Sequence, residues 1–283
     1  MKKTVAIIMA GTVAFSVFTG CSININVHSP SDTSSVSDWD VISNKGSLII
    51  GMSYFEPMNF FGEDSKLTGF ETEFATAVCG ELGVTPVFQE IEWDSKEIEL
   101  KAKTIDCIWN GFTITEERNE NMDFSVPYMQ NEQVVVMKAE NIGRYKTADD
   151  LKGAKVVVES GSAGEKVVQF EDFFREATCT PADSQAKCLL EVKSGTSDIA
   201  VIDYALTVGV LCEGGDYTDL RMAENMTFAP ELYGAAFRKG SPETIKKVNV
   251  AISKLDKEGK LHEIAEKYHL ADHICTINIE EIG

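Results

Sequence analysis

Short apolar segments alternate with amphipathic segments along most of this chain. Residues 47–51 (SLIIG) form an apolar run that predicts a β-strand, and residues 69–82 place their apolar side chains on one face of a helix. The alternation continues to residue 268 and predicts an α/β protein with largely parallel sheets. The expected strands are 47–51, 87–91, 106–109, 155–158, 198–202 and 233–237, and the expected helices are 69–82, 95–103, 164–175, 183–193, 242–258 and 260–268.

One sequence pattern occurs twice. Residues 103–109 (KTIDCIW) and 195–201 (GTSDIAV) each follow a predicted helix with a short break and then an Asp at the start of a strand. Two similar α/β halves would account for the repeat.

Polar and aromatic residues follow four of the predicted strands. Ligands of open parallel sheets bind beyond the carboxyl ends of the strands, so we expect a site for a small polar ligand there. The residues concerned are Ser53, Tyr54, Phe55 and Glu56 after the first strand, then Asn110, Gly111 and Thr113, then residues 159–164 (ESGSAG), and finally Asp203.

Arg118 is the candidate group for binding a carboxylate. It follows Thr113 by five residues, and a guanidinium grips a carboxylate with two parallel hydrogen bonds. Arg118 also stands among Glu116, Glu117 and Glu120. From charge alone, a surface ion pair is the more ordinary role.

Other strand-end residues also have structural alternatives. Thr113 fits turn chemistry, and Ser162 and Asp203 fit the N-caps of the helices that follow them. Free N–H groups at a helix N-terminus also bind anions, which keeps Ser162 and Ala163 as candidate ligand-binding residues. Tyr54 suits the core as well as a pocket wall.

The N-terminal residues have the features of a secretion signal. Lys2 and Lys3 precede an apolar stretch, 4–18, that is short for a membrane span. The sequence Phe18-Thr19-Gly20-Cys21 then looks like a lipobox, in which the Cys is lipidated. We expect residues 1–20 to be removed and Cys21 to anchor the protein outside the cell membrane. An ordinary secretion signal and an N-terminal membrane anchor are the alternatives.

Residues 21–38 are rich in Ser, Asn and Asp and are expected to form a flexible tether.

The formal net charge of the chain is −19 and no cluster of Lys or Arg stands out, so a nucleic acid is not an expected partner. His269 and His273 fit a solvent-facing tail better than a metal site, and neither a metal nor a cofactor is expected.

The cysteines suggest both buried thiols and one disulfide. Cys79, Cys107 and Cys212 lie inside apolar runs and are expected to be buried. Cys179 and Cys188 flank a loop with a proline and are the best candidates for a disulfide in an exported protein.

Residues 110–128 closely resemble the signature of the bacterial extracellular solute-binding proteins of family 3, the amino-acid receptors of ABC importers. That pattern reads small-Gly-x-[Ser/Thr]-Ile-Thr-x-x-Arg and then Phe-Ser-x-Pro-Tyr. This chain has NGFTITEER at 110–118 and FSVPY at 124–128. The resemblance covers about residues 45–270. It implies a two-lobe, type II periplasmic-binding-protein fold, in which each lobe is a mostly parallel sheet flanked by helices.

The resemblance also implies how the chain divides. The first lobe would take residues 39–130 and, after the second lobe at 131–233, residues 234–283, which include a C-terminal tail. The two crossovers between the lobes are expected near 130–133 and 228–234.

The roles of the site residues come from the same resemblance. In similar receptors the arginine at the position of Arg118 holds the α-carboxylate of an amino acid. An aspartate at the position of Asp203 takes the α-ammonium group. The other groups that grip the ligand would be Thr113 and the backbone around Gly111, beside Asn110, from the first lobe, and Ser162 and the backbone of Ala163 from the second.

The first loop departs from the family pattern Tyr-x-Pro-Phe, because this chain reads Tyr54-Phe55-Glu56-Pro57-Met58-Asn59-Phe60. Glu56 is expected either beside the ligand side chain, where it would favour a cationic or donor-rich group, or in solvent.

The sequence thus predicts a monomeric, lipid-anchored receptor that delivers a free, polar amino acid to an ABC permease. The rival is an enzyme that resembles the dehydratases of cyclic carboxylic acids, which share this fold. Its candidate acids would be Glu56, Glu159 and Asp203. A third possibility, the sensing domain of a signalling protein, would need a transmembrane segment or a fused output domain.

Overall fold

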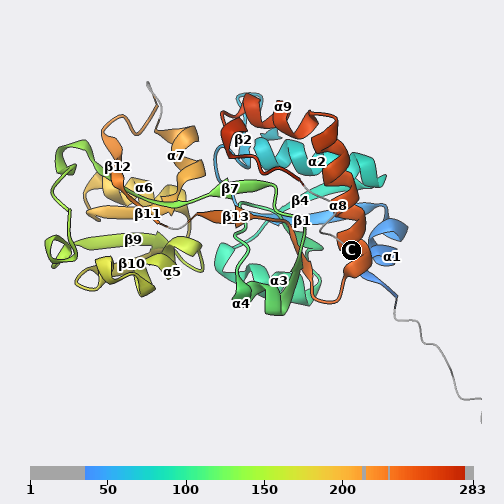
Figure 1. Cartoon of the computed structure of the whole chain (residues 1–283), viewed down its shortest axis with the longest axis horizontal. Coiled ribbons are helices and arrows are strands. Elements are labelled where there is room, and N and C mark those ends of the chain that lie inside the picture. The colour runs from blue at the N-terminus through green and yellow to red at the C-terminus, as the bar shows by residue number, and fades with distance from the viewer. Residues whose placement is uncertain (1–35, 212–214, 229, 278–283) are drawn as a thin grey trace, which may run out of the picture. The chain divides into compact units, whose positions relative to one another are not determined.

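A computed structural model describes residues 36–211, 215–228 and 230–277 of the 283-residue chain. The predicted signal peptide, Cys21 and most of the tether lie outside these residues, as does Cys212. The described part folds into two α/β lobes, each built on a five-stranded sheet (Figure 1). We call the lobe that contains residue 36 the first lobe.

The sheet of the first lobe is mixed. Its strand order is β4-β1-β5-β14-β6, with β1 parallel to β4 and β5, and β14 antiparallel to β5 and β6. The strands are β1 (Ser47–Met52), β4 (Thr85–Glu90), β5 (Cys107–Ile108), β6 (Met122–Phe124) and β14 (Ala236–Arg238). The helices are α1 (Asp38–Lys45), α2 (Phe70–Leu82), α3 (Lys96–Ala102), α4 (Glu116–Asn121), α8 (Pro242–Lys257) and α9 (Lys260–Lys267).

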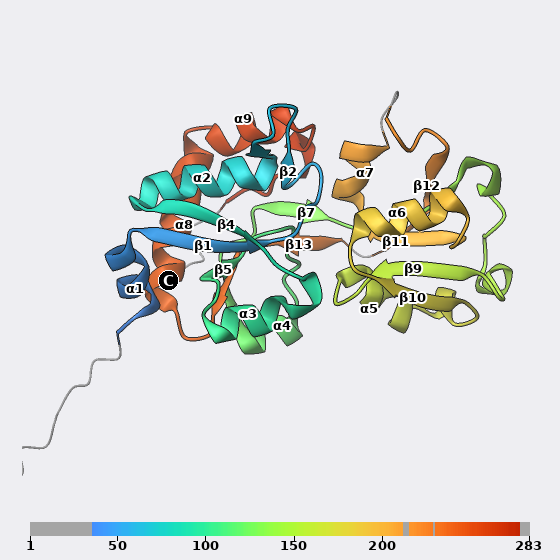
Figure 2. The ribbon, with the colours of Figure 1, turned by 180° about the vertical axis from the view of Figure 1, so that it is seen from behind.

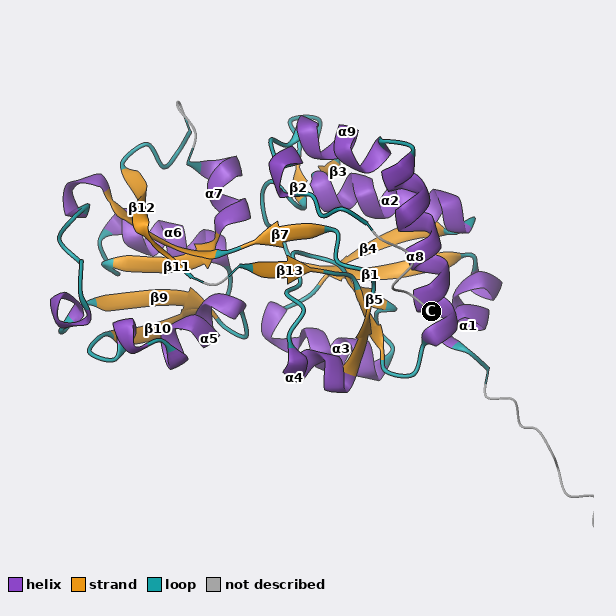
Figure 3. Ribbon diagram, in the orientation of Figure 1, coloured by secondary structure: helices purple, strands orange, loops and turns teal. Residues whose placement is uncertain are grey.

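The second lobe repeats this arrangement. Its order is β10-β9-β11-β8-β12, with β9 parallel to β10 and β11, and β8 antiparallel to β11 and β12. The strands are β8 (Gln133–Lys138), β9 (Lys155–Glu159), β10 (Thr178–Ala182), β11 (Ile199–Asp203) and β12 (Leu220–Thr227), and the helices are α5 (Ala163–Phe170), α6 (Gln185–Ser194) and α7 (Tyr204–Val210). Helices lie on both faces of each sheet (Figures 2 and 3).

Two antiparallel strands run between the lobes. They are β7 (Met129–Asn131) and β13 (Glu231–Tyr233), and Asn131 lies opposite Glu231 in their register (Figure 1). The two short strands β2 (Phe60–Phe61) and β3 (Leu67–Thr68) pair with each other in the first lobe. Because the crossing strands join the lobes, residues near either end of them can contact both.

The predicted two-lobe α/β fold is confirmed, and most predicted elements are present within a few residues of their expected bounds. The predicted strand at 233–237 is wrong in one respect, because β13 ends at Tyr233 and β14 begins at Ala236. Gly234 lies in the break, where an added Cβ would be 2.9 Å from Ile114 Cδ1. Four strands of each sheet run in the same direction, and only the strand that follows a crossover, β14 or β8, runs antiparallel to its neighbours.

Several elements were not predicted. The helix α1 begins with a capping box, in which the Ser37 hydroxyl accepts from Asp40 N and the Asp40 carboxylate accepts from Ser37 N. The strand β8, which lies between β11 and β12, contains a fully buried apolar run from Val134 to Met137. The predicted helix at 164–175 ends as α5 at Phe170 and gives way to a 3₁₀ turn at Asp172–Phe174.

The predicted disulfide between Cys179 and Cys188 is wrong, because both side chains are free thiols. Cys188 is buried on the inner face of α6 and its Sγ donates to Ser184 O, whereas Cys179 is exposed on the edge strand β10. Cys79 and Cys107 are buried, as predicted.

No helix within the described ranges is both long and apolar enough to cross a membrane. Those ranges also contain no cluster of three or more His, Cys, Asp or Glu side chains suited to a metal ion. The His273 ring packs against the Tyr204 ring of the second lobe, with 4.9 Å between their centroids.

Candidate ligand-binding site

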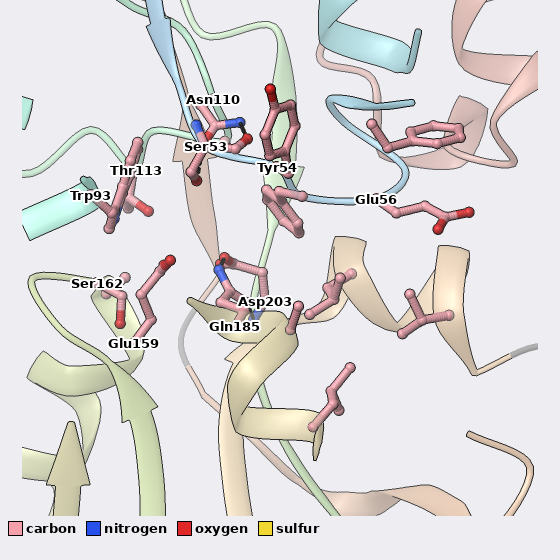
Figure 4. Close-up of a pocket in the computed structure, with 18 of the residues that line it drawn as sticks. Ser53, Tyr54, Glu56, Trp93, Asn110, Thr113, Glu159, Ser162, Gln185 and Asp203 are labelled. Atoms are coloured by element: carbon pink, nitrogen blue, oxygen red, sulfur yellow. Dashed lines mark hydrogen bonds between the residues drawn. The ribbon is translucent and has the colours of Figure 1, made fainter. Parts of the chain in front are cut away.

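A cavity of 330 Å³ lies between the two lobes, and side chains of both lobes form its walls (Figure 4). The structure brings every residue of the predicted site to this cavity, although the predicted set comes from four separate strand ends. The predicted residues in its lining are Tyr54, Glu56, Asn110, Gly111, Thr113, Arg118, Ser162, Ala163 and Asp203.

Asn110 and Gly111 shape the wall of the first lobe. The Asn110 amide accepts from Ser53 N at 3.0 Å and from Ser53 Oγ at 2.8 Å, and it donates to Ser53 O at 3.0 Å. These bonds tie the end of β5 to the end of β1. Gly111 has φ of 55° and an added Cβ would lie 2.9 Å from the Phe55 ring, so glycine is required there. Its N–H donates to Glu71 Oε2 at 2.7 Å.

The Arg118 guanidinium is held at the cleft by contacts other than ion pairs. Its Nη1 donates to Thr113 O at 2.7 Å, and the guanidinium stacks 4.3 Å from the centre of the Phe112 ring. None of the ion pairs formed among the described residues includes Arg118. The surface ion pair that charge alone suggests is therefore not formed, and part of the guanidinium remains available to an anion.

The Thr113 hydroxyl has a partner that the sequence analysis did not include. It donates to Glu231 Oε2 at 2.9 Å, and Glu231 belongs to the crossing strand β13. A hydroxyl that donates its proton to a carboxylate still has lone pairs that can accept from an ammonium group.

Ser162 and Ala163 lie where β9 leads into α5. The Ser162 hydroxyl accepts from Glu165 N at 3.1 Å, so Ser162 caps the helix as the structural alternative predicts. Its proton remains free to donate elsewhere. Ala163 is the first residue of α5, where backbone N–H groups have no partner within the helix.

Asp203 does not cap α7 with its side chain, although it occupies the N-cap position. Its carboxylate instead accepts from three amide side chains. These are Asn131 at 2.7 Å, Gln133 at 2.5 Å and Gln185. The carboxylate is thus fixed at the cavity by donors from β7, β8 and α6, and Figure 4 shows Gln185 beside it.

Tyr54 and Glu56 line the cavity from the loop that follows β1. The Tyr54 ring packs against Phe61 with 5.1 Å between centroids. Glu56 is exposed, and its carboxylate points away from Asp203 and Gln185 (Figure 4). Asp216 and Tyr217 are also in the lining of the cavity.

The profile of the bacterial extracellular solute-binding proteins, family 3, matches residues 48–271 of this chain. The chain belongs to this family.

Two curated relatives and one solved structure show which members it is similar to. The L-cystine-binding protein TcyJ of Escherichia coli is 32% identical over 82% of this chain and 85% of its own length. The L-arginine-binding protein of Pseudomonas aeruginosa is 30% identical over 77% and 85%. A substrate-binding protein of an ABC uptake transporter from Streptococcus pneumoniae, solved with bound histidine, is 32% identical, covers 85% of this chain and 99% of that one, and superposes with a TM-score of 0.77.

The names of these three relatives describe them as binding proteins. The family 3 protein described here is accordingly a solute-binding protein of the amino-acid class used by ABC uptake transporters, and it is not an enzyme. The dehydratase reading of Glu56, Glu159 and Asp203 is therefore set aside.

Four buried carboxyl groups surround the cavity of this family 3 protein. Burial raises the pKa of Glu159 to about 8 and that of Glu71 to about 7. Burial also raises the pKa of Asp203 and of Glu231, and the charge of Asp203 adds to the rise for Glu231. At neutral pH the site thus carries less negative charge than its formula suggests.

Within the described residues, several contacts join the two lobes beside the cavity. Lys96 of α3 and Arg118 both donate to Gly161 O, at 2.9 Å and 3.5 Å. The Glu117 and Lys166 side chains pair at 3.6 Å between α4 and α5. An added Cβ at Gly209 of α7 would lie 3.0 Å from Pro57. The two helices α4 and α5 face each other along one edge in both ribbon views (Figures 1 and 2).

Sequence reasoning missed several residues of this site. Asn131 and Gln133, which hold Asp203, are polar positions spaced by two around a strand crossover, and that spacing was an available signal. Glu71 and Lys96 lie inside helices whose sequences look ordinary, and nothing local marks them as buried. Glu231 and Gln185 are likewise recognisable only through contacts with residues distant in sequence.

Proposed function

We propose that this protein is a lipid-anchored, extracytoplasmic receptor that binds one free, polar amino acid and delivers it to an ABC permease. The observation that carries the proposal is the opposite chemistry of the two cavity walls. An arginine without an ion-pair partner stands on the first lobe, and a carboxylate held by three amides stands on the second. A free amino acid carries the two complementary charges.

The carboxylate end of the ligand belongs with Arg118 in this proposal. The guanidinium is fixed by Thr113 O and the Phe112 ring, and it keeps its charge at every physiological pH. The N–H groups that begin α5, at Ala163, and the Ser162 hydroxyl approach from the other lobe. Such donors complete the shell of a carboxylate at a helix N-terminus.

The ammonium end belongs with Asp203. The three amide donors hold the aspartate in one orientation, and they favour its ionised form. The Thr113 oxygen offers a second acceptor from the first lobe. Asn110 and the Gly111 N–H are already engaged with Ser53 and Glu71, so their part is to hold the wall in place.

In this proposal the ligand side chain lies against lining residues that the two charged ends of the ligand leave unused, namely Glu56, Tyr54, Asp216 and Tyr217. Two carboxylates and two phenol groups favour a cationic or donor-rich group. The relatives that bind L-cystine, L-arginine and histidine support this choice, because each of those ligands has N–H donors beyond its α-amino group. Substituting Glu56→Gln should then weaken binding of L-arginine more than binding of L-glutamine.

The two-lobe arrangement suits capture by closure. Residues 131–233 would move as the second lobe about the crossing strands, a hinge motion known in periplasmic binding proteins. Closure excludes water, which strengthens the ion pair between the ligand and Arg118. A permease could then recognise the closed shape of the monomer.

The membrane anchor is proposed from the sequence of residues 18–21, which lie outside the described residues. A fatty-acid analogue should label the wild-type protein in cells. The Cys21→Ser variant should lose both the label and its place in the membrane fraction.

A thermal-shift screen tests the receptor function. The mature protein is heated with each of the twenty amino acids, L-cystine and L-ornithine. A ligand present at 100 times its Kd adds about 2.7 kcal/mol to the free energy of unfolding, which raises Tm by roughly 5–10 °C for a chain of this size. If no amino acid in the screen raises Tm, the proposal fails.

A further inference from the structure

Glu159 has no function in the scheme above, yet it is buried at the cavity. It is the last residue of β9, next to the parallel strand β11, whose last residue is Asp203. Glu159 is 4% exposed and its side chain points into the cavity between Ser162 and Asp203 (Figure 4). Two carboxyl groups therefore face the same space.

Asp203 and Glu159 differ in the hydrogen bonds that stabilise their ionised forms. Asp203 accepts from the amides of Asn131, Gln133 and Gln185, and those bonds favour its ionised form. Glu159 has Gln185 as its hydrogen-bond partner. None of the ion pairs among the described residues includes Glu159. When two adjacent buried acids share one proton, the proton stays on the acid whose ionised form accepts fewer hydrogen bonds.

We propose that Glu159 is a ligand-binding residue that is neutral in the empty cavity and ionised against a positively charged group of the bound amino acid. This inference rests on the receptor function proposed above. It adds a role for Glu159 in ligand binding and the release of its proton. The carboxyl O–H bond breaks on binding, the electron pair stays on the carboxylate, and the proton leaves to solvent. One proton is thus released for each ligand bound.

The groups around Glu159 favour its neutral form. Burial is the largest cause that raises its pKa to about 8, and the charge of Asp203 adds to it. Lys96 acts in the opposite direction across the cleft, and its own pKa is lowered to about 8 by burial and by Arg118. Other ionisable groups near this part of the site are Cys188 on α6, Glu231 on β13 and Arg118 in the cavity lining.

Proton linkage gives the expected dependence on pH. A cationic group beside Glu159 lowers its pKa in the complex, so binding favours the deprotonated form. Affinity then rises with pH, by up to about tenfold per pH unit below the pKa of the free receptor, and levels off above about pH 8. A group that is ionised in both states would give no such rise.

Isothermal titration calorimetry in phosphate and in Tris at one pH measures the proton, because the two buffers differ in ionisation enthalpy. The probes are L-arginine, L-histidine and L-cystine. For a probe that binds, we expect about one proton released at pH 7.0, where the α-ammonium group of the free probe is already protonated. The Glu159→Gln variant should release almost none at pH 7.0, and Glu120→Gln, which removes an exposed acid of α4, should behave as wild type.

Each result decides the matter. A wild-type protein that binds a probe without releasing a proton overturns the assignment and leaves the receptor function intact. A release that persists in Glu159→Gln assigns the proton to Asp203 or Glu231 and also overturns it. Binding by none of the probes or screened amino acids removes the receptor function itself. If Glu159→Gln does not fold, the rise of wild-type affinity from pH 6 to pH 8 still decides, because its absence excludes the linkage.

Discussion

Lys96 donates a hydrogen bond from Nζ to the carbonyl oxygen of Gly161, 2.9 Å away on the opposite lobe. The same ammonium group donates to Trp93 O at 3.0 Å and lies 4.7 Å from the centre of the Trp93 ring. A buried lysine is costly unless its charge is satisfied. The bond to Gly161 exists when the lobes touch, so Lys96 favours the closed arrangement.

Substituting Lys96→Met should therefore weaken ligand binding. The methionine keeps the packing against Trp93 and removes the bond between the lobes, which is worth about 1–1.5 kcal/mol, or about five- to tenfold in Kd. Stopped-flow fluorescence should place most of the change in the rate of release. Lys101→Met, an exposed change on the same helix, is the matched control. Equal Kd values for wild type and Lys96→Met would show that the bond does not contribute to closure.

Gly209→Ala should raise stability and lower affinity. Gly209 lies inside α7, where alanine is favoured over glycine by up to about 1 kcal/mol. Its Cβ would, however, meet the backbone of Pro57 at 3.0 Å, and Pro57 belongs to the first lobe. The unliganded protein should therefore melt at the same temperature or higher while Kd increases.

Gly80→Ala on α2 is the control for that experiment, because an added Cβ there meets nothing within 4 Å. It should raise Tm without changing Kd. If Gly209→Ala binds ligand as tightly as Gly80→Ala, the approach of α7 to Pro57 does not limit closure.

Arg118→Ala should abolish most of the affinity. Hydrogen bonds to charged groups contribute about 1.5–3 kcal/mol each, so losing a bidentate contact should raise Kd by at least about 100-fold. Arg118→Lys keeps the charge without the planar pair of donors and should fall between wild type and alanine. Titration calorimetry with the amino acid chosen by the thermal screen measures all three. Unchanged binding by Arg118→Ala would place the ligand carboxylate elsewhere.

The buried carboxyl group of Glu71 should make the stability of the unliganded protein depend on pH. Its carboxyl group accepts from the Tyr128 hydroxyl and from Gly111 N, and burial raises its pKa from 4.5 to about 7. Because the folded state holds this proton more tightly than the unfolded state, the contribution of Glu71 to stability is full below pH 4.5. It falls as pH rises to 7, by roughly 3 kcal/mol at most.

The Glu71→Gln variant isolates that effect. We expect it to be less stable than wild type, by about 1–3 kcal/mol at pH 5, because one of the two donors loses its acceptor. The difference in the free energy of unfolding should shrink between pH 5 and pH 8, as urea melts of both proteins would show. A constant difference would mean that Glu71 is ionised throughout this range.

The sequence was informative where function depends on local patterns. The pattern of apolar residues predicted the bounds of β1, α2, β9 and β11 closely. Each of these elements buries either one face or most of its side chains, and burial leaves a clear apolar pattern. The signature at 110–118 identified Arg118 and Thr113, since the turn after β5 and the start of α4 carry both residues within a short segment. Asp203 was a candidate because it directly follows the predicted strand at 198–202, and the family resemblance then gave it a role.

The features that could not be predicted from the sequence are contacts between residues far apart along the chain. Glu231 bonds to Thr113, which is 118 residues away, and Glu71 bonds to Gly111, 40 residues away. No local pattern shows that such acids are buried. The Cys179–Cys188 pairing failed for the same reason, because spacing does not reveal that Cys188 faces inward from α6 while Cys179 is exposed on an edge strand.

The crossing strands β7 and β13 do more than join two lobes. Asn131 on one strand bonds to Glu231 on the other, and the same Nδ2 atom donates to Asp203. The groups that orient the proposed ammonium site are therefore part of the segment about which the lobes would turn. Rotation of the lobes changes the geometry of this shared amide, so the polarity of the cavity and the angle between the lobes cannot vary independently. In this protein the pivot is also part of the ligand's environment.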